Sequence, residues 1–253
     1  MSRTPADGRV RVLEETELRT DDGVRLAADL YRPAGTPRGT VVLAHGFSGT
    51  RRGIAVVEQA ASLTRAGFVV LTYDARGHGA SSGDSTMGRD EVHDLAAAVA
   101  HLRRLDPAPI TVGASMGAQS VLEYAVTDPR LCGIVLVSAA TSWWSVLTPR
   151  GLGVTAVLRT AVGRALARRV FGVRIDPRWQ ASGPATELIG GVGLPVAIVH
   201  GLDDPMVRPR AAAELYEAAR PPRRLELVRG MGHAFTRGGI AAIDRAVVWV
   251  ATQ

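Results

Sequence analysis

The stretch Ile110-Thr111-Val112-Gly113-Ala114-Ser115-Met116-Gly117-Ala118-Gln119-Ser120 is the most informative segment of this chain. Its first residues are apolar or β-branched, which is typical of a strand buried in a sheet. A serine then lies midway between two glycines, ahead of a helical pattern over residues 116–126. The spacing predicts a strand-to-helix turn so sharp that side chains at Gly113 and Gly117 would collide, and such a turn exposes the Ser115 hydroxyl. A merely flexible loop is the alternative interpretation.

Short apolar runs on either side of this stretch indicate further buried strands. They are residues 41–44, 69–71, 110–112, 134–137 and 195–199, with a more alternating, edge-like run at 225–228. Helical periodicity lies between them, for example over residues 91–105. Two alternating segments, 10–18 and 24–32, predict an antiparallel hairpin at the start. The pattern predicts an α/β fold with a mostly parallel, doubly wound sheet of about eight strands, whose carboxyl edge binds ligands.

One interval, between the strand ending near residue 140 and that starting near residue 194, is too long for an ordinary connection. Its apolar residues follow helical spacing at Val154, Val157, Leu158, Ala161, Val162, Ala165 and Leu166. The sequence predicts a helical cap at 141–185, inserted after the sixth strand of a core formed by 1–140 and 186–253. Arginines beside the stripe also suit a membrane surface. Because the stripe is mild and rich in alanine, we expect it to pack on the protein's own core.

Composition excludes several classes of protein. The 253 residues are 46% hydrophobic, enough for one large core, and the single Cys132 cannot form an internal disulfide. The polar N-terminus and the lack of long apolar runs predict a cytoplasmic protein without stable membrane insertion. The formal charge of +6 comes from arginines without interleaved aromatic residues, so we expect no nucleic-acid partner. A homodimer remains open.

A serine hydroxyl needs a base, and the base needs an orienting group. Among the histidines, His233 lies in a glycine-rich loop after the 225–228 run, at the predicted carboxyl edge. The others are His45, His78 and His200 near strand ends or turns, and His93 and His101 in a helical pattern. For the acid, Asp204 is favoured over Asp203, because its place three residues before Val207 fits a strand-end acid motif. Asp203 is then a turn residue.

In this order the motifs make the chain similar to the α/β-hydrolase superfamily, from the first hairpin to the last helix. The matching segments are His45-Gly46-Phe47, residues 73–81, the turn at Ser115, the loop at Asp204 and the pair Gly232-His233. The chain most resembles small lipases, esterases and serine-peptidase-like hydrolases with a helical cap. Residues 23–31 also resemble acyl-peptidase relatives. Ala114 departs from many relatives, which carry histidine or a larger residue there.

The resemblance implies roles for several further residues. The backbone N–H groups of Phe47 and Met116 would form an oxyanion hole. The turn at residues 74–81 would brace the edge of the active site. Trp143 and Trp144, at the start of the cap, would either line an acyl pocket or join the cap to the core, and the sequence does not separate these two roles.

No cofactor or metal is expected. Asp90, His93 and Asp94 share a helical face, but a solvated, salt-bridged surface is the better interpretation of that group. The glycines at 77, 79 and 83 lack the spacing of a dinucleotide-binding turn.

The sequence therefore predicts a serine hydrolase that cleaves a carboxylic ester of a small-molecule acyl substrate, with Ser115, His233 and Asp204 as a catalytic triad. A serine nucleophile argues against epoxide hydrolysis and dehalogenation. The alternatives are a thioesterase, an amidase or an acyl-transferring or cyclising enzyme with the same triad. A C–C hydrolase and a non-catalytic ligand-binding relative are further alternatives.

Overall fold

The computed structural model describes residues 14–141, 148–180 and 183–253, and in this part of the chain eight strands form one sheet. The strands are β1 (Glu14–Arg19), β2 (Arg25–Tyr31), β3 (Thr40–Ala44), β4 (Val69–Tyr73), β5 (Ile110–Ala114), β6 (Gly133–Val137), β7 (Val196–Gly201) and β8 (Arg223–Val228). The predicted α/β sheet of about eight strands is confirmed. Residues 10–13 of the predicted first strand lie outside the described residues.

The strands follow the order β1-β2-β4-β3-β5-β6-β7-β8. The pairs β1–β2 and β2–β4 are antiparallel, which confirms the predicted hairpin, and all later pairs are parallel. From β3 the chain first moves to one side through β4 and then to the other side from β5 onward. Such a reversal opens a crevice at the carboxyl ends of the central strands, where ligands bind in open α/β sheets.

The parallel strands are continuous apolar runs because both of their faces are buried. In β3, Val42 and Ala44 enter one hydrophobic core, whereas Val41 and Leu43 enter the core on the opposite face. The last strand, β8, stays partly exposed along its length, as its alternating sequence predicts for an edge.

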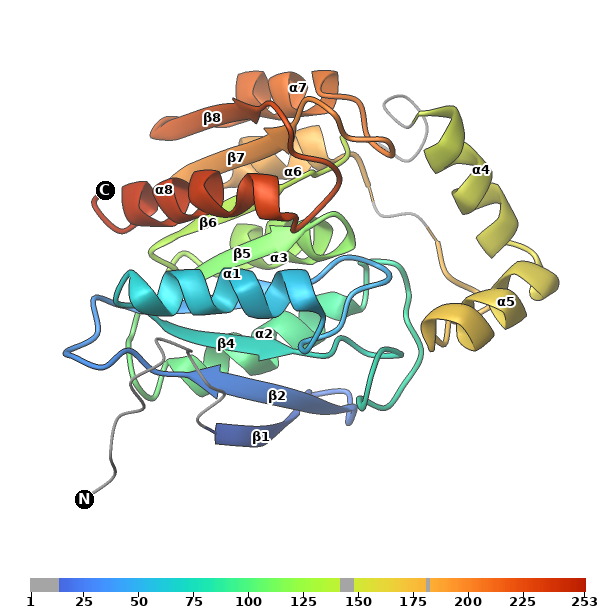
Figure 1. Ribbon diagram of the computed structural model, residues 1–253, viewed down its shortest axis with the longest axis horizontal. Helices are drawn as coiled ribbons and strands as arrows, with labels where there is room; N and C mark the ends of the chain where they lie inside the picture. The colour runs from blue at the N-terminus through green and yellow to red at the C-terminus, as the bar shows by residue number, and fades with distance from the viewer. Residues whose placement is uncertain (1–13, 142–147, 181–182) are drawn as a thin grey trace.

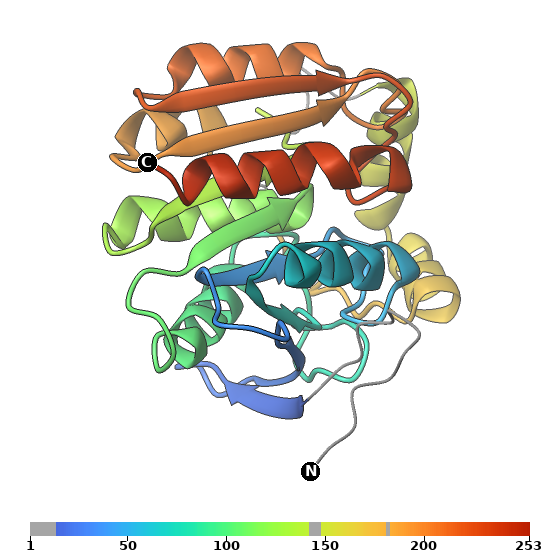
Figure 2. The same cartoon turned by 60° about the vertical axis from the view of Figure 1, so that its left-hand side comes forward.

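Helices cover both faces of the sheet and give a three-layer molecule (Figures 1 and 2). One layer contains α1 (Ile54–Arg65) and α8 (Ile240–Val250), which follows a short 3₁₀ turn at Arg237–Gly239. The opposite layer contains α2 (Glu91–Leu102), α3 (Met116–Thr127), α6 (Ala185–Gly191) and α7 (Arg210–Ala218). Among the described residues, no helix combines the length and the apolar character needed to cross a bilayer.

Two further helices, α4 (Pro149–Leu158) and α5 (Ala161–Phe171), lie outside these layers, beyond the carboxyl ends of the strands (Figure 1). We call them together the α4–α5 segment. Thr160 separates the two helices, because its side chain accepts a hydrogen bond from the N–H of Gly163 at 2.9 Å and so caps α5. The apolar stripe predicted across residues 154–166 is therefore divided between two helices.

The expectation that this stripe packs on the protein's own core is wrong for six of its seven residues, because only Leu158 is buried. Val157, Val162 and Leu166 are 50%, 80% and 54% exposed. In α5 only the small residues Gly163 and Ala167 are buried, so the larger apolar side chains next to them stay outside.

Candidate active site

Ser115 occupies the turn between the last residue of β5 and the first residue of α3. Its backbone has φ 53° and ψ −112°, which residues other than glycine rarely adopt. A Cβ atom on Gly113 would lie 2.3 Å from the carbonyl oxygen of Gly117, and one on Gly117 would lie 2.5 Å from that of Ala44. The predicted collision at the two glycines is confirmed, and it arises because α3 meets the backbone of β3 and β5 directly.

This close approach predicts a large difference between two Gly→Ala variants. Gly117→Ala is expected to lower the free energy of unfolding by about 2–4 kcal/mol, because backbone atoms cannot yield as a flexible side chain does. Gly153→Ala in α4, where a Cβ would meet no atom within 4 Å, is expected to raise it by up to about 1 kcal/mol. Urea unfolding of both variants measures the difference, and equal midpoints would contradict the close contact.

His233 connects Ser115 to Asp204. Its Nε2 atom lies 2.9 Å from the Ser115 hydroxyl oxygen, and its Nδ1 atom lies 2.8 Å from Oδ2 of Asp204. With the proton on Nδ1, the ring donates to the carboxylate and accepts from the hydroxyl. The structure therefore brings together the three residues that the sequence singled out, each from the carboxyl end of a different strand.

The Asp204 carboxylate is fully enclosed and held in one orientation. Its Oδ1 atom accepts hydrogen bonds from the backbone N–H groups of Met206 at 2.8 Å and Val207 at 2.9 Å. Burial acts to raise the pKa of Asp204, but the hydrogen bonds from His233 and these N–H groups outweigh burial and hold it below its ordinary value. The carboxylate is thus ionised where it faces the imidazole.

The neighbouring Asp203 has a different position. Its Oδ2 atom accepts a hydrogen bond from the backbone N–H of Gly230 at 2.7 Å, and its side chain is exposed. Asp203 therefore links the loop after β7 to the loop that carries His233, and it does not contact the imidazole in the described hydrogen bonds.

Phe47 and Met116 both line the same cavity as Ser115. Met116 is the first residue of α3, so its N–H has no partner within the helix. In the described part of the chain, no hydrogen bond engages the N–H of Phe47 or of Met116. Two residues that line the cavity with Ser115 therefore have backbone N–H groups without a partner among the described residues.

Residues of the 74–81 turn form hydrogen bonds with the loop that contains Phe47. The ring of His78 donates through Nε2 to the carbonyl oxygen of Phe47 at 2.5 Å, and Asp74 accepts from the N–H of Arg51 at 2.7 Å. His45 accepts from the N–H of Ala75 at 3.1 Å, which requires a neutral Nε2. Burial and the nearby His78 ring lower the pKa of His45 to about 4, so this acceptor persists at neutral pH.

A cavity of about 630 Å³ extends from Ser115 and His233 toward the α4–α5 segment. Most of its lining side chains are apolar and come from separate elements: Phe47, Ile54, Met87, Leu122, Val154, Leu158, Phe171, Met206 and Phe235. Among the described lining residues none carries a carboxylate, and Arg150 is charged. The cavity is therefore suited to an apolar group next to the Ser115 hydroxyl.

Sequence reasoning missed two residues that shape this cavity. Met87 lies in a loop with φ 63° and lines the cavity, and Trp179 packs with Met87 and Leu158 while the Arg159 guanidinium covers its ring. Trp179 thus joins the α4–α5 segment to the core. The sequence feature that could have indicated this role is a single tryptophan just after the arginine-rich stretch. Trp143 and Trp144 lie outside the described residues.

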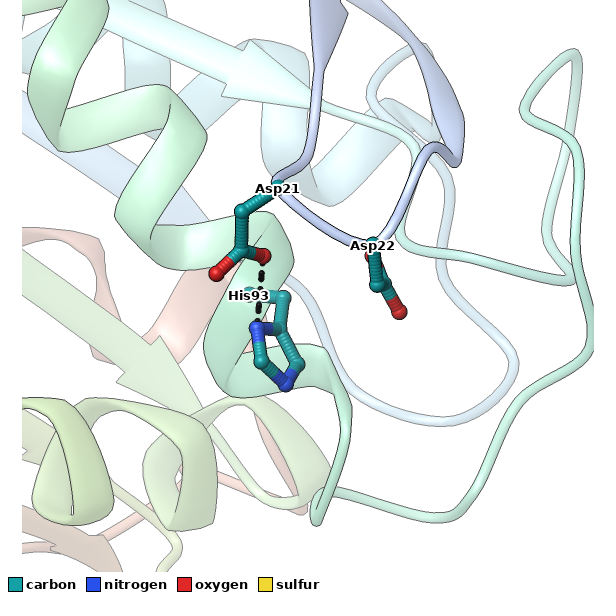
Figure 3. A group of neighbouring side chains, drawn as sticks. All are labelled: Asp21, Asp22 and His93. Carbon is teal, nitrogen blue, oxygen red and sulfur yellow. Dashed lines mark hydrogen bonds and ion pairs between the residues drawn. The ribbon is translucent and has the colours of Figure 1, made fainter.

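The three residues of the charged group predicted at α2 each form an ion pair, as expected for a salt-bridged face, but Asp94 is buried and not solvated. Asp94 pairs with Arg76 and Asp90 with Arg89, while His93 lies 2.7 Å from Asp21 (Figure 3).

Among the described residues, Asp21, Asp22 and His93 have atoms close enough to share a metal ion. However, both Asp22 oxygens accept from the Arg76 guanidinium, at 2.8 and 3.1 Å. These side chains lie away from the cavity lining, on the turn between β1 and β2 and on α2. They form a surface charge network.

The sequence of the chain matches a known protein family. A sequence model for the family described as "Serine aminopeptidase, S33" matches residues 35–187. No curated protein matches the chain.

Solved structures share the fold. The Pyrococcus furiosus esterase Pf2001 is 21% identical with a TM-score of 0.72, covering 100% of this chain and 95% of that one. The α/β hydrolase GrgF from Penicillium sp. sh18 is 17% identical with a TM-score of 0.74, covering 94% and 97%. Est1E from Butyrivibrio proteoclasticus, solved with bound ferulic acid, is 21% identical with a TM-score of 0.67, covering 92% and 96%.

Proposed function

The chain belongs to the α/β-hydrolase family described as serine aminopeptidase S33, and we propose that it is a serine hydrolase that cleaves carboxylic esters through an acyl-enzyme. One observation carries the proposal: hydrogen bonds run from Ser115 through His233 to Asp204 at the end of an apolar cavity. A nucleophile, a base and an orienting acid within hydrogen-bond reach are the parts that acyl transfer needs.

In the proposed reaction, the Ser115 oxygen attacks the ester carbonyl carbon while His233 Nε2 accepts the hydroxyl proton. The N–H groups of Phe47 and Met116 stabilise the oxyanion of the tetrahedral intermediate. The C–O bond to the alcohol then breaks, and the imidazolium returns the proton to the leaving alcohol. Water, deprotonated by His233, releases the acid and restores the serine. Asp204 keeps the Nδ1–H tautomer and stabilises the imidazolium in both steps.

The cavity lining favours an ester over the N-terminal residue of a peptide. A peptide's ammonium group loses its hydration in such a cavity and needs a carboxylate partner. Among the described lining residues there is none, and the sequence has no Asp or Glu at 142–147 or 181–182 either. An apolar acyl ester needs no carboxylate partner. We therefore propose esterase activity, although the family's description names an aminopeptidase.

We also propose that the α4–α5 segment, within residues 141–185, acts as a cap over the site. Val154, Leu158 and Phe171 of this segment line the cavity opposite the sheet. Substrate choice would then depend on the cap. A cytoplasmic location is part of the proposal, in line with a single cysteine that leaves the chain without an internal disulfide.

The test is hydrolysis of nitrophenyl esters of increasing acyl length, beside alanine nitroanilide as an aminopeptidase substrate. We expect ester cleavage that improves as the acyl chain grows to fill the apolar cavity, and no release of nitroaniline. The Ser115→Ala variant is the control for non-enzymatic turnover. Cleavage of the anilide at rates above those of all the esters would contradict an esterase.

A further inference from the structure

Exposed apolar side chains gather on the α4–α5 segment. Among the described residues, eleven large apolar side chains are exposed, and six of them belong to these two short helices: Val154, Val157, Val162, Leu166, Val170 and Phe171. Single exposed apolar residues are ordinary, but a contiguous set marks an interaction surface.

The exposed apolar residues of α5 lie on one side of the helix. Val162, Leu166 and Val170 recur every four residues and form one exposed strip along the helix. Gly163 and Ala167, next to this strip, face the protein. The solvent-facing side of α5 therefore carries an apolar strip, and no described part of the chain covers it.

The charge of the chain is concentrated on the same segment. Residues 149–171 contain five arginines and neither Asp nor Glu. Since the chain has 30 basic and 24 acidic residues, all its other residues together carry a net formal charge of only +1. Among the described residues, Arg164, Arg168 and Arg169 have no ion pair with a carboxylate. The segment thus presents a positive potential beside exposed apolar groups.

Part of this exposed apolar surface also lines the cavity that contains Ser115. Ile54 at the start of α1, Val154 on α4 and Phe171 on α5 all line the cavity, and they are 75%, 38% and 53% exposed. A partner surface that covers the apolar strip would therefore also contact exposed residues that line the cavity around Ser115.

We propose that the α4–α5 segment docks on the surface of an anionic lipid membrane, with Val162, Leu166 and Val170 entering the headgroup region and the arginines facing lipid phosphates. Basic amphipathic helices bind such interfaces through both apolar burial and charge. A second copy of this chain would bring two equally positive faces together. A nucleic acid would match the arginines but leave the apolar strip uncovered. Peripheral docking of this kind needs no membrane-spanning helix, and it stands independently of the ester chemistry.

The test is cosedimentation with vesicles of phosphatidylcholine alone or with about one third phosphatidylglycerol. The wild type is expected to bind the anionic vesicles, and added salt should weaken this binding. Leu166→Asp should reduce the affinity at least tenfold. Arg168→Gln combined with Arg169→Gln should reduce it about 25-fold, since each basic residue near an anionic surface contributes about fivefold.

Leu105→Asp is the matched control, because Leu105 is 47% exposed but lies after α2, at the opposite end of the sheet. It should bind as the wild type does, and circular dichroism should show that all variants fold. Hydrolysis of a short soluble ester, measured separately, tests the catalytic proposal without involving vesicles.

Three results would overturn membrane docking. The first is no binding to anionic vesicles. The second is normal binding by Leu166→Asp, which would indicate recognition of polyanions by arginine alone. The third is a wild-type dimer in sedimentation that Leu166→Asp dissociates without any vesicle binding.

Discussion

Replacement of Ser115 by alanine is expected to lower kcat on a nitrophenyl ester by about 10⁴- to 10⁶-fold, with little change in KM. The change removes the oxygen that would form the bond to the acyl carbon. The hydroxyl contacts only His233 among the described hydrogen bonds, so the fold loses little. Alanine tolerates the φ of 53° about as well as serine does, and the thermal unfolding midpoint should stay near that of the wild type.

Ser120→Ala provides the matched serine control. Ser120 lies five residues further on in α3, is buried, and donates to the carbonyl oxygen of Gly88 at 3.1 Å. Its loss should leave kcat within a few-fold of the wild type. A fluorophosphonate probe should label the wild type and Ser120→Ala but not Ser115→Ala. Wild-type rates in Ser115→Ala would remove the nucleophile from the proposed mechanism.

Asp204→Asn is expected to lower kcat by about 10⁴-fold. The carboxylate accepts from Nδ1 of His233 at 2.8 Å and so keeps the other ring nitrogen free to take the Ser115 proton. An asparagine amide that presents its NH₂ group would favour the opposite tautomer, in which Nε2 carries a proton and cannot act as a base. The amide also cannot stabilise the imidazolium by charge.

The adjacent Asp203→Asn variant separates this role from general effects of the loop. Asp203 accepts from the N–H of Gly230, and an asparagine oxygen can accept the same bond. We expect kcat within about tenfold of the wild type, because only an exposed charge is removed. The opposite order of the two variants, measured under the same conditions, would move the acid to Asp203.

The sequence could predict that Ser115, Asp204 and His233 come together because these residues follow strands. Ser115, Asp204 and His233 each come just after a β-rich run, and parallel strands bring such positions to one edge. The glycines beside Ser115 added a backbone constraint that the structure reproduces at Gly113 and Gly117. Local pattern and spatial position coincide in these cases.

Other features depend on contacts that local pattern does not report. The order in which β4 precedes β3 in the sheet results from pairing between distant segments. Trp179 and Met87 shape the cavity through packing across about ninety residues of chain, which no periodicity reveals. The division of the apolar stripe into two helices could have been predicted from local sequence. Thr148-Pro149 and Thr160 are residue types that begin helices. Which flank of α5 meets solvent had no such signal.

The contact between His233 and Ser115 joins residues 118 positions apart, and the loop that carries His233 follows the last strand. During synthesis, therefore, a ribosome-bound chain that has not yet reached residue 233 would have the proposed nucleophile but not the proposed base. In the proposed mechanism, the nascent protein would stay unreactive toward acyl groups until β8 has paired with β7 and the loop after β8 has brought His233 to Ser115.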